Sequence, residues 1–223
     1  MLGTVIDIII RYKEGLLSGL LVTLGLCLIV WISGLIFGVL FGAFAYRQKE
    51  STGFVLKILS FLLASIPILV LLFWLHYPLQ ELLGVVIMPF ITAAVALSLL
   101  NIVGVAQIVR DVLADFPQQY AIAGKVCGLS DKEIFAKIEF PIIFRQIIPQ
   151  FLTLQVNMLQ MTLFASLISV EEIFRVAQHI NSLIYKPVEI YTALGVFFIA
   201  ICLPLNILAY WLKNKYTRNY SEK

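Results

Sequence analysis

Charged residues are scarce in this chain of 223 residues, and their scarcity excludes an ordinary soluble domain. Asp, Glu, Lys and Arg make up 13% of the sequence, where ~25% is usual, and apolar residues make up 61%. Five stretches contain no charge at all, and each exceeds the ~20 residues that a membrane-spanning helix needs. We therefore predict an all-α integral membrane protein with one domain, residues 1–223, and five spans at about 16–45, 58–79, 84–109, 147–170 and 190–212.

Ligands for metals and nucleotides are missing as well. The three cysteines and two histidines are scattered, with no Cys-x-x-Cys pair and no histidine beside a cysteine, so we predict no metal or redox site and interpret His76 as an interfacial residue. A phosphate-binding loop is also absent, because Gly124-Lys125 has Gln119 at the upstream glycine position and Val126 where Ser or Thr is needed. We expect this chain to bind no cofactor itself.

The few charges that remain are distributed unevenly. Twelve of the 16 Lys and Arg fall in three segments, 45–57, 110–145 and 213–223, that five spans would place on one side of the membrane. Because basic residues accumulate on the cytoplasmic side, we predict a multi-pass protein with an extracytoplasmic N-terminus and a cytoplasmic C-terminus. The other side receives only Arg11, Lys13, Arg175 and Lys186.

The longest polar connection, residues 110–145, contains ten charged residues and is expected to lie outside the bilayer. Within it, Pro117 can open a short helix, and Gly128 can supply the left-handed residue that closes it. A second helix follows at once, because Ser130 and Glu133 have the spacing of a capping box, in which each satisfies a free backbone N–H of the other. A polar unit of two short helices between two spans is typical of a docking surface.

Pro141 is predicted to end this second helix, because a proline cannot continue the α-helical hydrogen-bond ladder. The unit therefore spans about 116–141. Helix-turn-helix DNA binding is an alternative interpretation of 117–140, but three acidic residues there balance three basic ones, and both ends lead into apolar spans. We predict no nucleic-acid partner.

Small residues mark a packing face in the first apolar run, because they let another backbone approach closely. They recur four residues apart at Gly15 and Gly19, and then at Gly34, Gly38 and Gly42. In the second run, the sequence Ser65-Ile66-Pro67 predicts a kink near the proline.

The fourth apolar run is rich in hydroxyl and amide side chains, which are costly in hydrocarbon unless they find partners. At ~100° per residue they divide between two faces of a helix, Gln155, Thr162, Ser166 and Ser169 on one, and Thr153, Asn157 and Gln160 on the other. We expect this helix to be surrounded by protein and water. Either both faces make interhelical hydrogen bonds, or one of them lines a solute path.

A family resemblance rests on the polar connection. It follows the EAA signature of bacterial ABC-importer permeases (Glu-Ala-Ala, three residues, Gly, nine residues, Ile-x-Leu-Pro) at Ala123, Gly128, Ile138, Phe140 and Pro141. The chain departs from it at two positions, where Ile122 replaces Glu and Gly124 replaces the second Ala. Further segments resemble permeases for polar amino acids, namely residues 19–24, 108–110, 170–173 and 185–191.

The resemblance implies the type I ABC-importer permease fold, with five transmembrane helices and a cytoplasmic coupling-helix loop, in a bacterial cytoplasmic (inner) membrane. It implies two ABC ATPase subunits that hold ATP and Mg, a second copy or a paralogue of the permease, and an extracytoplasmic substrate-binding protein. The implied ATPase-coupling residues are Ala123, Gly124, Gly128, Leu129, Ser130, Ile138 and Pro141.

An amino acid, polar by the same resemblance, is the expected cargo. The family's solute contacts lie on the fourth helix, so the implied substrate-binding residues are Gln160 and Thr162. We add Glu172, just beyond the helix, because its carboxylate can meet the ammonium group of an amino acid near the outer mouth. The Lys-Asp/Asn-Thr-Ser of the family is Gln-Met-Thr-Leu at 160–163, and this loss of charge favours a neutral cargo or contacts from a paired, different permease. Because residues 65–67 resemble methionine permeases, methionine or another small solute is an alternative, as is a non-transporting membrane scaffold.

Overall fold

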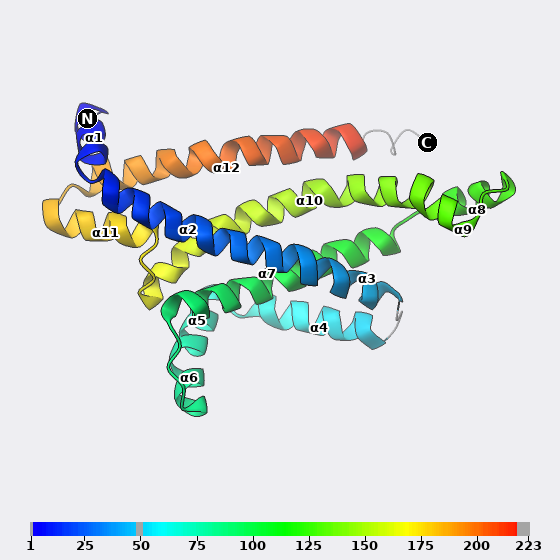
Figure 1. Ribbon diagram of the computed structural model, residues 1–223, viewed down its shortest axis with the longest axis horizontal. Helices are drawn as coiled ribbons and strands as arrows, with labels where there is room; N and C mark the ends of the chain where they lie inside the picture. Colours follow the sequence, from blue (N-terminus) through cyan, green and yellow to red (C-terminus); the bar gives the residue numbers. More distant parts are fainter. Residues whose placement is uncertain (1, 48–50, 218–223) are drawn as a thin grey trace.

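The computed structural model describes residues 2–47 and 51–217, and in this part of the chain every regular element is a helix (Figure 1). The prediction of an all-α protein is therefore confirmed. Three basic residues that entered the orientation count, Lys49, Arg218 and Lys223, lie outside the described residues.

Four helices of the described part are long and apolar enough to cross a membrane, and they run along the long axis of the molecule (Figure 1). The first consists of α2 (Lys13–Ser33), a π-helical turn (Gly34–Gly38) and α3 (Val39–Arg47). The others are α7 (Pro89–Ala114), the continuous helix Asp131–Ile168, and α12 (Pro187–Thr217). Residues 84–88, which the third predicted span includes, precede α7, because Gly84 ends the preceding helix in the left-handed conformation.

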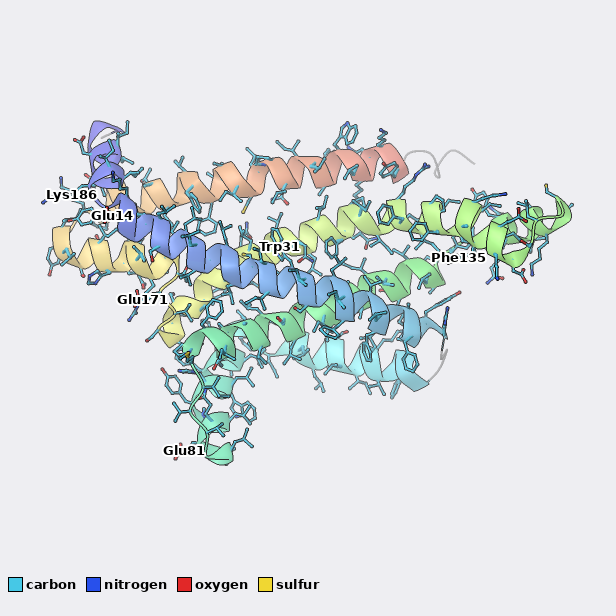
Figure 2. The ribbon with its side chains drawn as sticks, in the orientation of Figure 1. Glu14, Trp31, Glu81, Phe135, Glu171 and Lys186 are labelled. Carbon is cyan, nitrogen blue, oxygen red and sulfur yellow. The ribbon has the colours of Figure 1, made fainter. Side chains whose placement is uncertain are left out.

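The second predicted span is a broken one. A bend of 91° separates Phe54–Leu63 in α4 (Ser51–Ser65) from Ile68–Leu83, which contains α5 (Ile68–His76) and α6 (Pro78–Leu83). The predicted kink near Pro67 coincides with this break, where Pro67 has extended backbone and offers no N–H. Consequently α5 and α6 project from the bundle as an arm with Glu81 near its tip (Figures 1 and 2).

The prediction that Pro141 ends a helix is wrong. The elements α9 (Asp131–Ile134), a π-helical turn (Phe135–Glu139) and α10 (Phe140–Met161) follow one another without interruption. In an α-helix, the proline ring would crowd the carbonyl four residues earlier. The wider π-helical turn directly before Pro141 changes the hydrogen-bond spacing there and accommodates the ring. The second short helix therefore continues into the fourth span.

This long helix tightens to a 3-10 helix over Thr162–Ile168 and ends at Ser169, whose φ is 69°. The predicted division into two polar faces holds up to that point. Gln155, Thr162 and Ser166 are buried, whereas Thr153, Asn157 and Gln160 are exposed. Ser169 is exposed, contrary to the prediction, because it follows the last residue of the 3-10 helix and its left-handed backbone leaves the helical path.

The predicted glycine face packs against α7. A Cβ placed on Gly38 would lie 2.6 Å from the Cβ of Val105, and one on Gly42 would lie 2.5 Å from the Ala106 carbonyl oxygen. A Cβ on Gly34 would collide with the Asn101 amide. Only glycine permits this approach, so the first span and α7 form a tight pair.

Two amphipathic helices lie at the N-terminal end of the bundle. One is α1 (Leu2–Arg11), and the other is α11 (Ile173–Ile184), which follows the fourth span. Ile8, Ala177 and Ile180 are buried together with Ile190 of α12. The opposite end of the bundle holds α8 (Gln118–Val126) and α9 (Figure 1).

Candidate functional site

A tight turn at Gly128 joins α8 to α9. The Gly128 N–H donates to the Lys125 carbonyl at 3.0 Å, and the Leu129 N–H donates to the Gly124 carbonyl at 3.1 Å. These two bonds form a Schellman motif, in which the residue after the helix takes the left-handed conformation. Gly128 has a φ of 78°, so the predicted helix-closing role is confirmed. Pro117 occupies the N-cap position of α8, and the helix begins directly after it.

The predicted capping box at the start of α9 is also present. The Ser130 N–H donates to Oε2 of Glu133 at 3.1 Å, and the Glu133 N–H donates to Oγ of Ser130 at 3.4 Å. Nζ of Lys137 lies 2.9 Å from Oε1 of Glu133. Because this ion pair is largely exposed, water and salt screen it, and the backbone hydrogen bonds fix the turn.

Gly124, one of the two departures from the EAA signature, has a packing reason. A Cβ on this residue would lie 2.9 Å from Cγ1 of Ile134 and 3.1 Å from Cδ1 of Ile138. Ile134 is buried at this crossing of α8 over the next helix. The structure thus brings most of the predicted coupling residues into one unit, namely Ala123, Gly124, Gly128, Leu129, Ser130 and Ile138. Pro141 lies further along the helix that begins at Asp131.

The unit presents apolar side chains to its surroundings. Ile122 and Val126 of α8 are exposed, as are Phe135 and Phe140 on the helix that follows, and we call these four residues the α8–α9 surface. Figure 2 shows Phe135 at the end of the bundle away from Lys186 and Glu171. Exposed apolar side chains in the most charged segment of a chain indicate a protein-docking site.

A buried polar network joins three spans near the middle of the bundle. Nδ2 of Asn101 donates to the Val30 carbonyl at 2.7 Å and to Oε1 of Gln155 at 3.0 Å, and Nε2 of Gln155 donates to Oδ1 of Asn101 at 3.2 Å. Trp31 adds a bond from Nε1 to the Gln155 carbonyl. The sequence indicates Gln155 by its helical face, but Asn101 was missed because a single polar residue in an apolar run has no periodic signal.

The exposed polar face of α10 leads to a cavity of about 460 Å³ between α7, α10 and α12. Thr153 and Asn157 line it from α10, and Asn206, Tyr210 and Lys213 line it from α12. Amide groups at membrane depth are tolerated where they face water or a polar solute. The arrangement therefore supports the interpretation in which one face of this helix lines a solute path.

The three predicted substrate-binding residues do not share one site in this conformation. Gln160 is exposed and lies beside Cys202 of α12, on the face that leads to the cavity. Thr162 is fully buried, and its Oγ1 donates to the Leu159 carbonyl at 2.7 Å. Glu172 is buried at the start of α11.

Glu172 acts as the N-cap of α11. Its Oε2 accepts the Phe174 N–H at 3.0 Å and its Oε1 accepts the Arg175 N–H at 2.8 Å. Burial raises the pKa of the carboxyl group from 4.5 to about 7, although these two donors favour the charged form. The side chain is thus occupied within the protein. Among the described residues, no group of three or more His, Cys, Asp or Glu is placed to hold a metal ion.

A model of the family described as "Binding-protein-dependent transport system inner membrane component" matches residues 34–218. The nopaline transport system permease protein NocM of Agrobacterium fabrum is 25% identical over 225 residues, which cover 96% of this chain and 93% of that protein. The glutamate/aspartate import permease protein GltK of Escherichia coli is 24% identical over 209 residues, with 90% and 92% covered. The octopine transport system permease protein OccM of Rhizobium meliloti is 30% identical over 151 residues, 64% of this chain and 60% of OccM.

Two solved structures share the fold. One, described as an amino acid ABC transporter with histidines, has a TM-score of 0.80 at 20% identity. The match covers 93% of this chain and 96% of the transporter chain. The other, an inward-facing form of the MetNI methionine ABC transporter, has a TM-score of 0.65 at 17% identity and covers 94% and 96%. The predicted type I ABC-importer permease fold is therefore confirmed.

Proposed function

The chain belongs to the family of binding-protein-dependent transport system inner membrane components, and from this premise we propose that it is the permease subunit of an ABC importer for an amino acid. On this proposal, the chain carries cargo inward by alternating access, driven by ATP hydrolysis on two partner subunits. Those subunits, and not this chain, would bind ATP and Mg. A second permease copy or a paralogue would complete the pathway, and an extracytoplasmic binding protein would deliver the cargo.

One observation carries the proposal: the α8–α9 surface stands on a helix that continues into the membrane. The helix Asp131–Ile168 has 38 residues, so it is ~57 Å long at 1.5 Å per residue. A rigid connection of this kind would transmit a movement of the docked ATPase to Gln155 and Gln160 without an intervening loop. We place the α8–α9 surface on the cytoplasmic side, in agreement with the basic residues of 110–145.

The solute path in this proposal follows the exposed polar face of α10. Gln160 would hydrogen-bond the cargo. Asn157 and Thr153 would then hydrogen-bond it as it moves on into the cavity beside Lys213. These groups are neutral apart from the lysine, which suits a polar cargo without net charge. An amino acid is favoured as the class of cargo because GltK is a glutamate/aspartate import permease and the structure with a TM-score of 0.80 is an amino acid ABC transporter.

Assembly with the ATPase tests the proposal. The tagged chain is co-expressed with its cognate ATPase, and both co-purification and ATPase stimulation by the loaded binding protein are measured. Phe135→Glu should abolish both, because it places a charge in the α8–α9 surface. Leu183→Glu on α11 is the matched control, since Leu183 and Phe135 are 59% and 53% exposed. Full ATPase capture by the Phe135→Glu variant would contradict the proposed docking site, and failure of the wild-type chain to capture an ATPase would contradict the function.

A further inference from the structure

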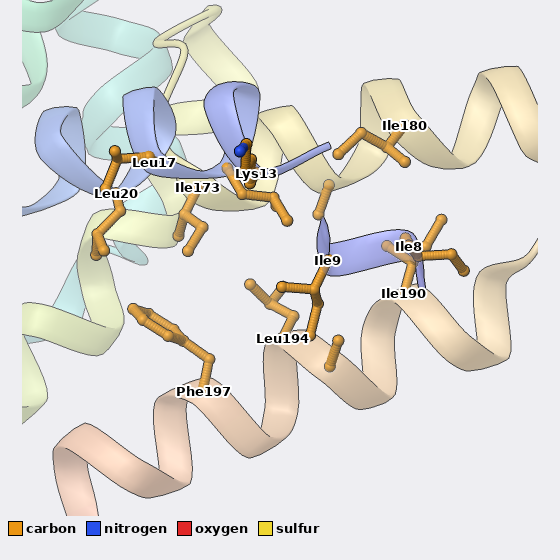
Figure 3. Close-up of a pocket in the computed structure, with 13 residues that line it drawn as sticks. Ile8, Ile9, Lys13, Leu17, Leu20, Ile173, Ile180, Ile190, Leu194 and Phe197 are labelled. Carbon is orange, nitrogen blue, oxygen red and sulfur yellow. The ribbon is translucent and has the colours of Figure 1, made fainter. Parts of the chain in front are cut away.

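A separate cavity of about 240 Å³ lies at the N-terminal end of the bundle (Figure 3). Its walls come from α1, α2, α11 and α12, and they are almost entirely aliphatic and aromatic. Figure 3 shows Leu20, Ile173 and Phe197 on one side of the space and Ile9 and Leu194 on the other. Such walls offer no hydrogen bonds to a polar solute, so this cavity is unsuited to the cargo of the proposed importer.

Lys13 is the single charged residue of this lining. It has no ion-pair partner among the described residues. The uncharged run of the first span begins two residues later, at Gly15, which places Lys13 at the membrane boundary. Tyr12 is half-buried beside it, with the Arg11 guanidinium 5.9 Å from the ring centroid, and such aromatic and basic residues are typical of the headgroup level.

An apolar space with one free cation at the membrane boundary matches an acyl chain joined to a phosphate. We propose that this cavity binds one acyl chain of an anionic phospholipid, whose phosphate faces Lys13. The lipid comes from the leaflet on the N-terminal side. The bound acyl chain contacts helices from both ends of the protein sequence and fills the space between α2 and α12.

A second copy of this chain is a poorer occupant. An α-helix with its side chains is ~10–12 Å across, which is wider than a space of about 240 Å³ between four helices admits. An acyl chain is slender and entirely apolar, so it can enter from the bilayer leaflet and make close van der Waals contacts with the apolar walls. A lipid also brings the negative charge that Lys13 lacks within the protein.

Native mass spectrometry tests the site. The purified complex is released from nanodiscs that contain equal amounts of phosphatidylglycerol and phosphatidylcholine, and the retained lipids are counted. Lys13→Gln should reduce the ratio of retained phosphatidylglycerol to phosphatidylcholine roughly fivefold, the scale expected for one lysine that faces anionic lipid. Ala193→Phe, which fills the cavity from α12, should reduce the retention of both lipids.

Matched controls lie outside the cavity. Lys186→Gln removes another exposed lysine from the same end of the bundle, and Ala200→Phe adds the same ring to an exposed position of α12, so both should behave as wild type. Unchanged lipid selectivity in Lys13→Gln, or wild-type retention in Ala193→Phe, would overturn the proposal. Because the readout is bound lipid, the result is independent of whether the chain transports an amino acid.

A photo-crosslinking residue in place of Leu17, an exposed lining residue of α2, covers the case in which Ala193→Phe fails to fold. Irradiation in the same nanodiscs should give an adduct with the mass of one phospholipid. An adduct with a second copy of this chain, or with another polypeptide, in place of lipid would show that protein covers the cavity and would overturn the proposal.

Discussion

Replacement of Gly128 with valine is expected to uncouple the ATPase from the loaded binding protein while the chain stays folded in the membrane. Gly128 closes α8 with a φ of 78°, and a Cβ there would meet no atom within 4 Å. The substitution therefore creates no steric clash with a neighbour. Its whole cost comes from a backbone conformation that residues with a side chain rarely adopt.

The magnitude follows from that conformation. A residue other than glycine in the left-handed region costs ~1–2 kcal/mol, and a β-branched side chain lies at the upper end. Only a few contacts hold the native turn against this cost. They are two backbone hydrogen bonds and the contact of Gly124 with Ile134, in an exposed part of the chain. At ~1.4 kcal/mol per factor of ten, the native turn should lose between about fivefold and about thirtyfold in population relative to opened forms. We expect ATPase stimulation to fall with the fraction of native turn, by up to that factor.

The assay is ATPase activity of the reconstituted complex with and without loaded binding protein. Gly84→Val is the matched control, because Gly84 also closes a helix with a positive φ of 63° and also has free space around a Cβ, but lies on the arm near α6. Gly128→Asn should recover part of the stimulation, since asparagine tolerates the left-handed conformation. Full stimulation in Gly128→Val, or an equal loss in Gly84→Val, would refute the reasoning.

Three further predictions concern the membrane part. Asn101→Leu leaves the Gln155 amide without its buried partner, so it should lower the free energy of unfolding in detergent by ~1–2 kcal/mol; an unchanged melting curve would show that the network is dispensable. Gln160→Leu should raise the half-saturation constant for uptake more than it lowers ATPase activity, whereas Gln107→Leu, at another exposed amide, should change neither; wild-type uptake in Gln160→Leu would exclude it as a cargo contact. Burial raises the pKa of Glu172 from 4.5 to about 7, so the folded state holds its proton more tightly than the unfolded chain, and stability should fall as pH rises from 4.5 to about 7. In Glu172→Gln this slope of melting temperature against pH should be reduced, and an identical slope in both proteins would assign the pH dependence to other groups.

Local chemistry made much of the α8–α9 unit predictable. The glycine turn and the capping box depend on residues three or four positions apart, and the sequence alone gives that spacing. The packing face of the first span was predictable for the same reason, because Gly34, Gly38 and Gly42 recur at helical spacing.

Features that depend on distant partners or on irregular helix geometry could not be predicted in the same way. Pro141 is a helix terminator in an α-helix, and only the π-helical turn over Phe135–Glu139 allows the helix to continue. Similarly, Ser169 leaves the buried face because the helix ends at Ile168 and Ser169 takes the left-handed conformation. Asn101 owes its burial to Val30 and Gln155, which lie 71 and 54 positions away in the sequence.

The candidate solute path shows the same limit. Gln160 was predicted from its position, which corresponds to one of the family's solute contacts. The cavity on the same face of α10 also includes Asn206 and Lys213 from α12, and no pattern in the sequence associates these two residues with the path. For Glu172, the structure shows a capping role that the sequence did not indicate. Its charge suggested a contact with cargo, and the structure shows a carboxylate that caps α11 from a buried position.

Uptake into proteoliposomes tests the central claim most directly. The chain is reconstituted with its cognate ATPase and, if required, a paired permease, and the accumulation of a panel of radiolabelled amino acids is followed with the binding protein on the outside and ATP in the lumen. The account predicts inward-directed movement of at least one amino acid against its gradient, when the orientation that exposes the ATPase to ATP is selected, and only with both ATP and the binding protein. An assembled complex that hydrolyses ATP and accumulates none of the amino acids would contradict it.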